Sequence, residues 1–303
     1  MTGGKGKRIK RILKILAVFV CLTAAACGIS IWISYHMLSV THYHIKSKKI
    51  KTPFRIVLLA DLHDHEFGQD NQYLVEMVEE QDPDLVIMDG DMVNGDSANA
   101  GICLQMIRKI RASRPGVPLV FSMGNHEIAY MRNGHPELTE ELTEAGAAVA
   151  DDSVCSLMVQ GNEIILGGTY KYGFETGMQD AESNEMILTY RDSFNASVDE
   201  STLSIMCAHR PESFYCWNTA DLWEADLILS GHNHGGQVIL PFAGGLYSSL
   251  EGFFPQYDYG QFFLGEDRDR PIIITRGLSS NHKKLPRFNN PPEITVIDIE
   301  TMP

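Results

Sequence analysis

Apolar and polar positions alternate in blocks along most of the chain. Short apolar runs bounded by turn residues predict eight β-strands, over residues 55–60, 84–88, 117–122, 163–168, 202–208, 226–230, 271–275 and 293–299. Amphipathic stretches between them predict helices over residues 71–81, 100–113 and 136–145. Because strands and helices alternate in the first half of this region, the pattern predicts an α/β fold.

The N-terminal segment has a different pattern, a long apolar run beside a basic cluster. Residues 15–33 carry no charge, and as a helix these 19 residues would span roughly the ~30 Å hydrocarbon core of a bilayer. A buried core helix fits this segment poorly, because it offers no polar face to water. We therefore expect a basic flank over residues 1–14, a transmembrane anchor over 15–36, a juxtamembrane linker over 37–52 and a folded domain over 53–303.

Two alternatives to an uncleaved anchor stay open. A signal peptide could be cleaved after the small residues 24–26, and Ala26 with Cys27 loosely resembles a lipoprotein site. The apolar run continues through Trp32, which favours an anchor that is retained. Six Lys and Arg residues precede the run and four Lys residues follow it, so we expect a single-pass protein of the cell membrane with a cytoplasmic N-terminus and an extracytoplasmic domain.

Charge and cysteine content narrow the function classes. The formal net charge is −14, although six of the 25 basic side chains fall in the first 14 residues. The rest of the chain is therefore strongly acidic, which argues against nucleic acid as a bulk partner. An acidic domain can bind a phosphorylated substrate where metal ions supply positive charge. The six cysteines have no CxxC spacing, so neither a zinc ribbon nor a disulfide scaffold is indicated.

Residues able to bind metal follow directly after five of the predicted strands, where open α/β sheets place their ligands. Carboxylates, imidazoles and an asparagine amide are all metal ligands, and the histidines can also move protons. Taken singly, each cluster has an ordinary explanation as a turn or a structural histidine. Together they recur in a fixed order that chance explains poorly. The clusters are Asp61-Leu62-His63, Gly90-Asp91, Gly124-Asn125-His126-Glu127, His209 and Gly231-His232-Asn233-His234.

This order of clusters resembles the calcineurin-like metallophosphoesterases, from about residue 54 to the C-terminus. Within that family the chain is most similar to the bacterial branch that has an N-terminal membrane segment. Residues 208–212, 231–237 and 286–293 carry the finer similarity. The resemblance implies a four-layer αββα sandwich, two central sheets flanked by helices, for the metallophosphoesterase domain over residues 53–303.

The resemblance also implies a centre of two divalent metal ions. One ion would be held by Asp61, His63, Asp91 and His234, and the other by Asp91, Asn125, His209 and His232, so that Asp91 bridges. This mixed nitrogen and oxygen set suits Mn, Fe or Zn better than Mg or Ca. A hydroxide shared by the two ions would attack phosphorus, and His126 would stabilise or protonate the developing charge.

Two positions depart from the family pattern. Asn94 stands where many relatives have an aspartate that orients the catalytic histidine, and Asp96 is a possible substitute. Asp89 is an additional acid, which either supports the metal ligands or lies exposed in a turn. Arg210 and Arg287 could each contact a substrate phosphate or form an ordinary salt bridge.

Aromatic residues concentrate over residues 240–264, which hold eight of the 27 in the chain. Two interpretations are open. A long loop could pack against the sheet, or a flap beside the metals could receive an apolar or glycosyl group at the membrane surface.

We therefore expect a membrane-anchored, metal-dependent phosphoesterase that hydrolyses a phosphodiester or pyrophosphate of a phosphorylated small molecule or a lipid-linked, cell-envelope substrate. One alternative is a non-catalytic, metal-dependent binding or scaffold protein on the same fold. A metallo-amidohydrolase is a further alternative, but its barrel would need more strand–helix units than the pattern contains.

Overall fold

The structure is a computed structural model that describes residues 3–170, 181–215, 219–280 and 285–302. Two six-stranded sheets form its centre. The first has the order β1-β16-β2-β3-β4-β5, with bounds Ser39–Ser47, Glu293–Thr301, Phe54–Leu59, Leu85–Asp89, Leu119–Ser122 and Ala148–Ala150. The second has the order β14-β15-β9-β8-β7-β6, with bounds Gly260–Leu264, Arg270–Ile274, Leu227–Ser230, Leu203–Ala208, Asn162–Thr169 and Ser153–Val159. All eight predicted strands are present.

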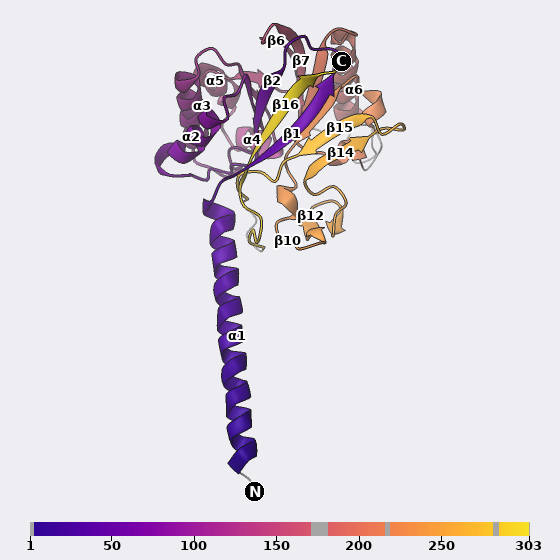
Figure 1. Cartoon of the computed structure of the whole chain (residues 1–303). Helices are drawn as coiled ribbons and strands as arrows, with labels where there is room; N and C mark the ends of the chain where they lie inside the picture. The colour runs from indigo at the N-terminus through magenta and orange to yellow at the C-terminus, as the bar shows by residue number, and fades with distance from the viewer. Residues whose placement is uncertain (1–2, 171–180, 216–218, 281–284, 303) are drawn as a thin grey trace.

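Alternating side chains of the buried strands build the layers of the domain. Ile56 and Leu58 of β2 pack between the sheets, whereas Val57 and Leu59 face the helices on the outer side of the first sheet. Helix α6 (Ala181–Ser197) covers the outer side of the second sheet. The helices of the first sheet are α2 (Gln72–Glu80), α3 (Gly101–Ser113), α4 (Asn125–Arg132) and α5 (Leu138–Ala145). The result is the expected four-layer sandwich (Figure 1).

The segment expected to be a juxtamembrane linker differs from the prediction. Residues 39–47 form β1, which pairs in parallel with β16 along its whole length. Its residues alternate between the exposed His42 and His44 and the more buried Tyr43 and Ile45, the pattern of a half-buried edge strand. The first sheet therefore begins before residue 53.

The N-terminal helix α1 (Gly3–His36) projects away from the domain (Figure 1). Residues 7–36 are long and apolar enough to cross a membrane, and their most apolar stretch is not buried against the rest of the described chain. Its last turns do contact the domain, since the backbone N–H groups of Asn289 and Asn290 donate to the hydroxyls of Ser30 and Ser34 at 3.0 and 3.1 Å.

Strand direction places the metal-binding candidates together. Strands β2, β3 and β4 are mutually parallel in the first sheet, and β7, β8, β9 and β15 are parallel in the second. The loops after β2, β3, β4, β8 and β9 therefore meet at one edge of the sandwich, where the carboxyl ends of both sheets converge.

Candidate metal centre

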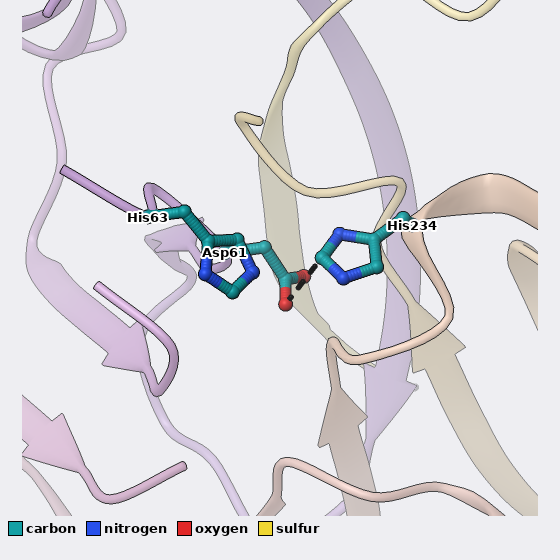
Figure 2. A group of neighbouring side chains, drawn as sticks. All are labelled: Asp61, His63 and His234. Atoms are coloured by element: carbon teal, nitrogen blue, oxygen red, sulfur yellow. Dashed lines mark ion pairs between the residues drawn. The ribbon is translucent and has the colours of Figure 1, made fainter. Parts of the chain in front are cut away.

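The loops at this edge bring the predicted metal-binding side chains into three overlapping groups. Each group has ligand atoms within 4.8 Å of one another: Asp61, His63 and His234; His63, Asp91 and His126; and Asp91, His209 and His232. In the first group, the Asp61 carboxylate points between the rings of His63 and His234 (Figure 2). Asn125 begins α4 beside these groups and lines the same cavity as Asp91, His126, His232 and His234.

Asp91 lies at the centre of the arrangement. One of its carboxylate oxygens, Oδ2, is 3.1 Å from Nε2 of His209 and 4.0 Å from Nε2 of His63. Nε2 of His209 is also 3.8 Å from Oδ1 of Asp61, which in turn is 3.8 Å from Nδ1 of His234. The Asp91 carboxylate is therefore within reach of imidazoles from both sheets, as a bridging ligand requires.

Hydrogen bonds assign the ring protons of the histidines. Nδ1 of His63 is 3.0 Å from Oδ1 of Asn94, and Nδ1 of His209 is 2.6 Å from the carbonyl oxygen of Asp89. An oxygen of this kind only accepts, so each Nδ1 donates and each neutral ring keeps a lone pair on Nε2. His126 has the opposite arrangement, because the N–H of Gly95 donates to its Nδ1 at 3.2 Å. Neutral His126 therefore carries its proton on Nε2.

Burial keeps three of the imidazoles neutral. It lowers the pKa of His63 to about 4, that of His232 to about 3, and that of His234 well below its ordinary value. His209 differs, because burial lowers its pKa but the opposing charges of Asp91, Asp61 and Asp89 raise it well above the ordinary value. Neutral imidazole is the form that binds metal ions.

The nitrogen and oxygen atoms of this cluster are suited to bind cations. Nε2 of His63 and Nδ1 of His232 are buried and have no hydrogen-bond partner among the described residues. At His209 a lone-pair nitrogen faces the Asp91 carboxylate, an arrangement that is repulsive unless a proton or a cation lies between the two. Imidazole nitrogens, carboxylates and an amide oxygen suit a transition metal ion or zinc.

Backbone strain is concentrated at the same residues. Asp61, His63, Asp91, His232 and His234 all have φ between 47° and 69°. This left-handed region is unfavourable for residues other than glycine, and such residues persist only where the surroundings fix them. The loops hold these side chains in directions that relaxed extended backbone would not give.

Glu127 is the functional residue that sequence reasoning placed in a motif without giving it a role. Its fully buried carboxylate accepts four backbone N–H groups, from Asp91, Met92, Val93 and Gly124, at 2.7 to 3.0 Å. Burial raises its pKa to about 7, while the four donors favour the ionised form. The spacing of Glu127 three residues after Gly124, as in a helix capping motif, was the available signal.

The two departures from the family pattern have local explanations. Oδ1 of Asn94 contacts His63, and its Nδ2 donates to Oδ2 of Asp64 at 2.9 Å. Asp96 is exposed. Asp89 is fully buried and its carbonyl oxygen orients His209, so the interpretation of an exposed turn acid is wrong.

The two arginines take different positions. Arg287 is fully buried and donates to the backbone carbonyls of residues 276, 277, 279, 290 and 291, so it cannot reach a substrate. Nε of Arg210 is 3.3 Å from Oδ1 of Asn125, which keeps Arg210 beside the candidate metal centre.

A cavity of about 220 Å³ opens above the cluster. Gln237, Tyr247, Ser248 and Ser249 line it opposite Asp91 and the histidines. The aromatic segment 240–264 therefore packs in part against the second sheet and lies in part beside the candidate metal centre. Tyr257 packs against Tyr215 and Phe262, whereas Tyr247 borders the cavity.

Comparison with known proteins identifies relatives. Residues 54–236 match the family of calcineurin-like phosphoesterases. The chain is 27% identical to the uncharacterized metallophosphoesterase YkuE of Bacillus subtilis, over 97% of this chain and 96% of that protein. It is 27% identical to the phosphodiesterase YaeI of Escherichia coli, over 82% of each. A shorter similarity, 31% over 31% of this chain and 28% of that protein, is to the UDP-2,3-diacylglucosamine pyrophosphatase LpxG of Chlamydia muridarum.

Proposed function

We propose a specific activity for this chain, which belongs to the calcineurin-like phosphoesterase family and is a metal-dependent phosphoester hydrolase. It is a membrane-anchored enzyme that hydrolyses the phosphodiester or pyrophosphate bond of a cell-envelope or lipid-linked substrate. The observation that carries this proposal is the position of the Asp91 carboxylate between imidazoles that come from two different sheets.

Two sets of side chains would hold the metal ions, with Asp91 common to both. The first set adds Asp61, His63 and His234, and the second adds Asn125, His209 and His232. Two divalent cations, Mn, Fe or Zn, would supply the charge that lowers the pKa of a water nucleophile and attracts the phosphoryl oxygens. The Nδ1 hydrogen bonds of His63 and His209 orient both rings toward this role.

His126 is the proposed proton donor. Its Nδ1 accepts from the N–H of Gly95, so Nε2 is the ring atom that would carry a proton to the leaving oxygen. The backbone N–H of His126 also donates to Oδ1 of Asp91 at 2.8 Å, which fixes the start of α4 against the cluster. The same residue therefore holds one carboxylate oxygen of Asp91 and lines the cavity.

The cavity lining supports a substrate with more than one polar group near the scissile bond. Gln237, Ser248 and Ser249 offer neutral hydrogen-bonding groups on the side opposite the metal-binding residues. A diester or pyrophosphate has a second substituent on phosphorus that such groups can contact. The names of two relatives, a phosphodiesterase and a lipid-related pyrophosphatase, point to the same substrate classes.

The proposed location follows from α1. A single apolar helix preceded by basic residues favours a cytoplasmic N-terminus and a catalytic domain outside the membrane. An extracytoplasmic domain would meet envelope substrates rather than the nucleotide pool.

The test is a panel of monoester, diester and lipid-linked substrates, assayed on the full chain with added Mn, Zn or Fe. We expect turnover of a diester or pyrophosphate, and a loss of roughly 100-fold or more together with bound metal in Asp91→Asn. Asp96→Asn, an exposed acid in the same loop, is the matched control and should be unaffected. Full activity of Asp91→Asn would contradict the bridging role. Metal binding without turnover of any substrate would favour the scaffold alternative.

A further inference from the structure

Two small hairpins beside the cavity expose large apolar side chains. They consist of β10 (Ile239–Leu240) with β11 (Gly244–Gly245), and β12 (Tyr247–Ser248) with β13 (Gly252–Phe253). We refer to residues 239–254 as the flap. Its exposed apolar side chains, with the exposed fraction of each, are Phe242 (110%), Phe253 (71%), Phe254 (58%) and Leu250 (38%).

Backbone conformation makes two of these phenylalanines unusual. Phe242 has φ of 68° and Phe254 has φ of 59°. A bulky aromatic residue is disfavoured in this left-handed region, where glycine or asparagine is the ordinary choice. Neither burial nor backbone geometry explains a phenylalanine at these positions, which points to an apolar partner outside the folded domain.

The flap also forms one wall of the cavity. Tyr247, Ser248 and Ser249 line it together with Asp91 and His126. The exposed apolar tips and the candidate metal centre are therefore held on the two sides of one short segment.

Hydrogen bonds connect the flap and the metal centre to the end of α1. Asn289 donates through its backbone N–H to Ser30 and through Nδ2 to the carbonyl of Ile239, each at 3.0 Å. Asn290 donates in the same way to Ser34 and, at 2.7 Å, to the carbonyl of His234. The hairpins lie on the same side of the domain as α1 (Figure 1).

The position of Ser30 sets the depth of these contacts. Ser30 is three residues before the end of the apolar run 15–33, which is about 5 Å along a helix axis. If this run fills the hydrocarbon core, the residues bonded to Ser30 lie near the boundary between acyl chains and headgroups. The flap contains a single charged residue, the acidic Glu251, so electrostatic attraction to anionic lipids would not contribute to its binding.

We propose that the apolar tips of the flap insert into the outer surface of the bilayer and hold the cavity against it. This inference rests on the proposed function, and it defines the substrate further as a membrane-embedded amphiphile whose phosphoester lies at headgroup depth. Phe242, Phe254 and Leu250 enter the interface, while the other wall of the same segment faces the phosphoester.

Fluorescence measures the insertion independently of activity. The full chain with Phe242→Trp is reconstituted in phosphatidylcholine vesicles with and without brominated acyl chains, and the native protein provides the background emission. We expect bromine to quench the added tryptophan. The control is Met158→Trp, at an exposed position on β6 at the end of the domain away from α1, and it should not be quenched (Figure 1). If neither tryptophan is quenched, or if both are quenched equally, the proposal is overturned. An emission change that depends on protein concentration would also overturn it, because that indicates self-association.

A second arm tests the consequence for substrate. Phe242→Asn with Phe254→Asn removes the apolar tips, and asparagine tolerates the left-handed backbone of both positions. We expect turnover of a long-chain phosphodiester in vesicles to fall about tenfold or more, while a short-chain soluble diester with the same headgroup is hydrolysed as before. Equal effects on both substrates would overturn the proposal. If the native chain hydrolyses neither, the proposed function fails, and quenching alone still decides whether the flap inserts.

Discussion

Replacement of Glu127 by glutamine tests how the Asp91 loop is held. The two oxygens of the Glu127 carboxylate divide four backbone donors equally: Oε2 accepts from Asp91 and Gly124, and Oε1 accepts from Met92 and Val93. Glutamine has the same shape but offers one oxygen and one amino group. In either orientation, two buried N–H donors would face another donor.

The cost follows from those two donors. Each buried group left without a partner costs about 1–3 kcal/mol, so we expect Glu127→Gln to lower the free energy of unfolding by about 2–6 kcal/mol. Natural domains are stable by only about 5–15 kcal/mol. For a domain of this size the loss corresponds to a decrease in Tm of roughly 5–20 °C.

The measurement is thermal and urea unfolding of the full chain in detergent at pH 8, where the Glu127 carboxyl is ionised. Glu144→Gln, on the exposed surface of α5, is the matched control and should change stability by less than about 0.5 kcal/mol. If Glu127→Gln is as stable as the control, the four hydrogen bonds do not support the loop and the reasoning is refuted.

Two further substitutions test the proposed proton donor, His126, and Asn94, which contacts His63. His126→Ala should lower turnover by about 10²–10⁴-fold with bound metal unchanged, because a proton donor is lost and no ligand is; elemental analysis that finds less metal would contradict this role. Asn94→Asp should weaken metal binding, because it places a second carboxylate 2.9 Å from Asp64 and removes a donor to that residue. Isothermal titration should show that Asn94→Asp binds Mn more weakly and that the added change Asp64→Asn restores the affinity. An unchanged affinity in Asn94→Asp alone would disprove the explanation.

The buried strands and the order of polar residues after them could be predicted from sequence. Strands such as β3 and β8 are buried on both faces, so they read as continuous apolar runs whose ends are clear. Because parallel strands of one sheet end at the same edge, Asp61, Asp91 and Asn125 of the first sheet could be expected to meet there. The family resemblance and this physical argument led to the same residues.

Half-exposed elements were harder to find. β1 and β6 alternate more exposed with more buried residues, and polar residues interrupt the apolar ones in both. β1 pairs with β16 across about 250 residues of intervening chain, and a partner so far away leaves no local signal. Such strands form because they pair with and pack against a neighbouring strand of the sheet, not because of their own sequence pattern.

Side-chain direction was the other quantity that the sequence did not determine. Arginine side chains often bind phosphate, but the guanidinium of Arg287 is enclosed by backbone carbonyls that only the folded loop brings together. Asn94 contacts His63 because the left-handed backbone at His63 and Asp64 turns those residues toward it. A motif fixes which residue types are present, and the backbone decides which atoms they meet.

The same distinction explains how strained loops remain in place. Five metal-binding candidates share a disfavoured backbone conformation, and neutral or like-charged groups would not hold them together without further support. That support comes from residues outside the predicted metal-binding set. Glu127 fixes the Asp91 loop from the first sheet, and Asn290 fixes the His234 loop while contacting α1. Because the Asp91 loop is held from within the domain and the His234 loop through Asn290, which also contacts α1, a change in the position of α1 should displace His234 before it displaces Asp91.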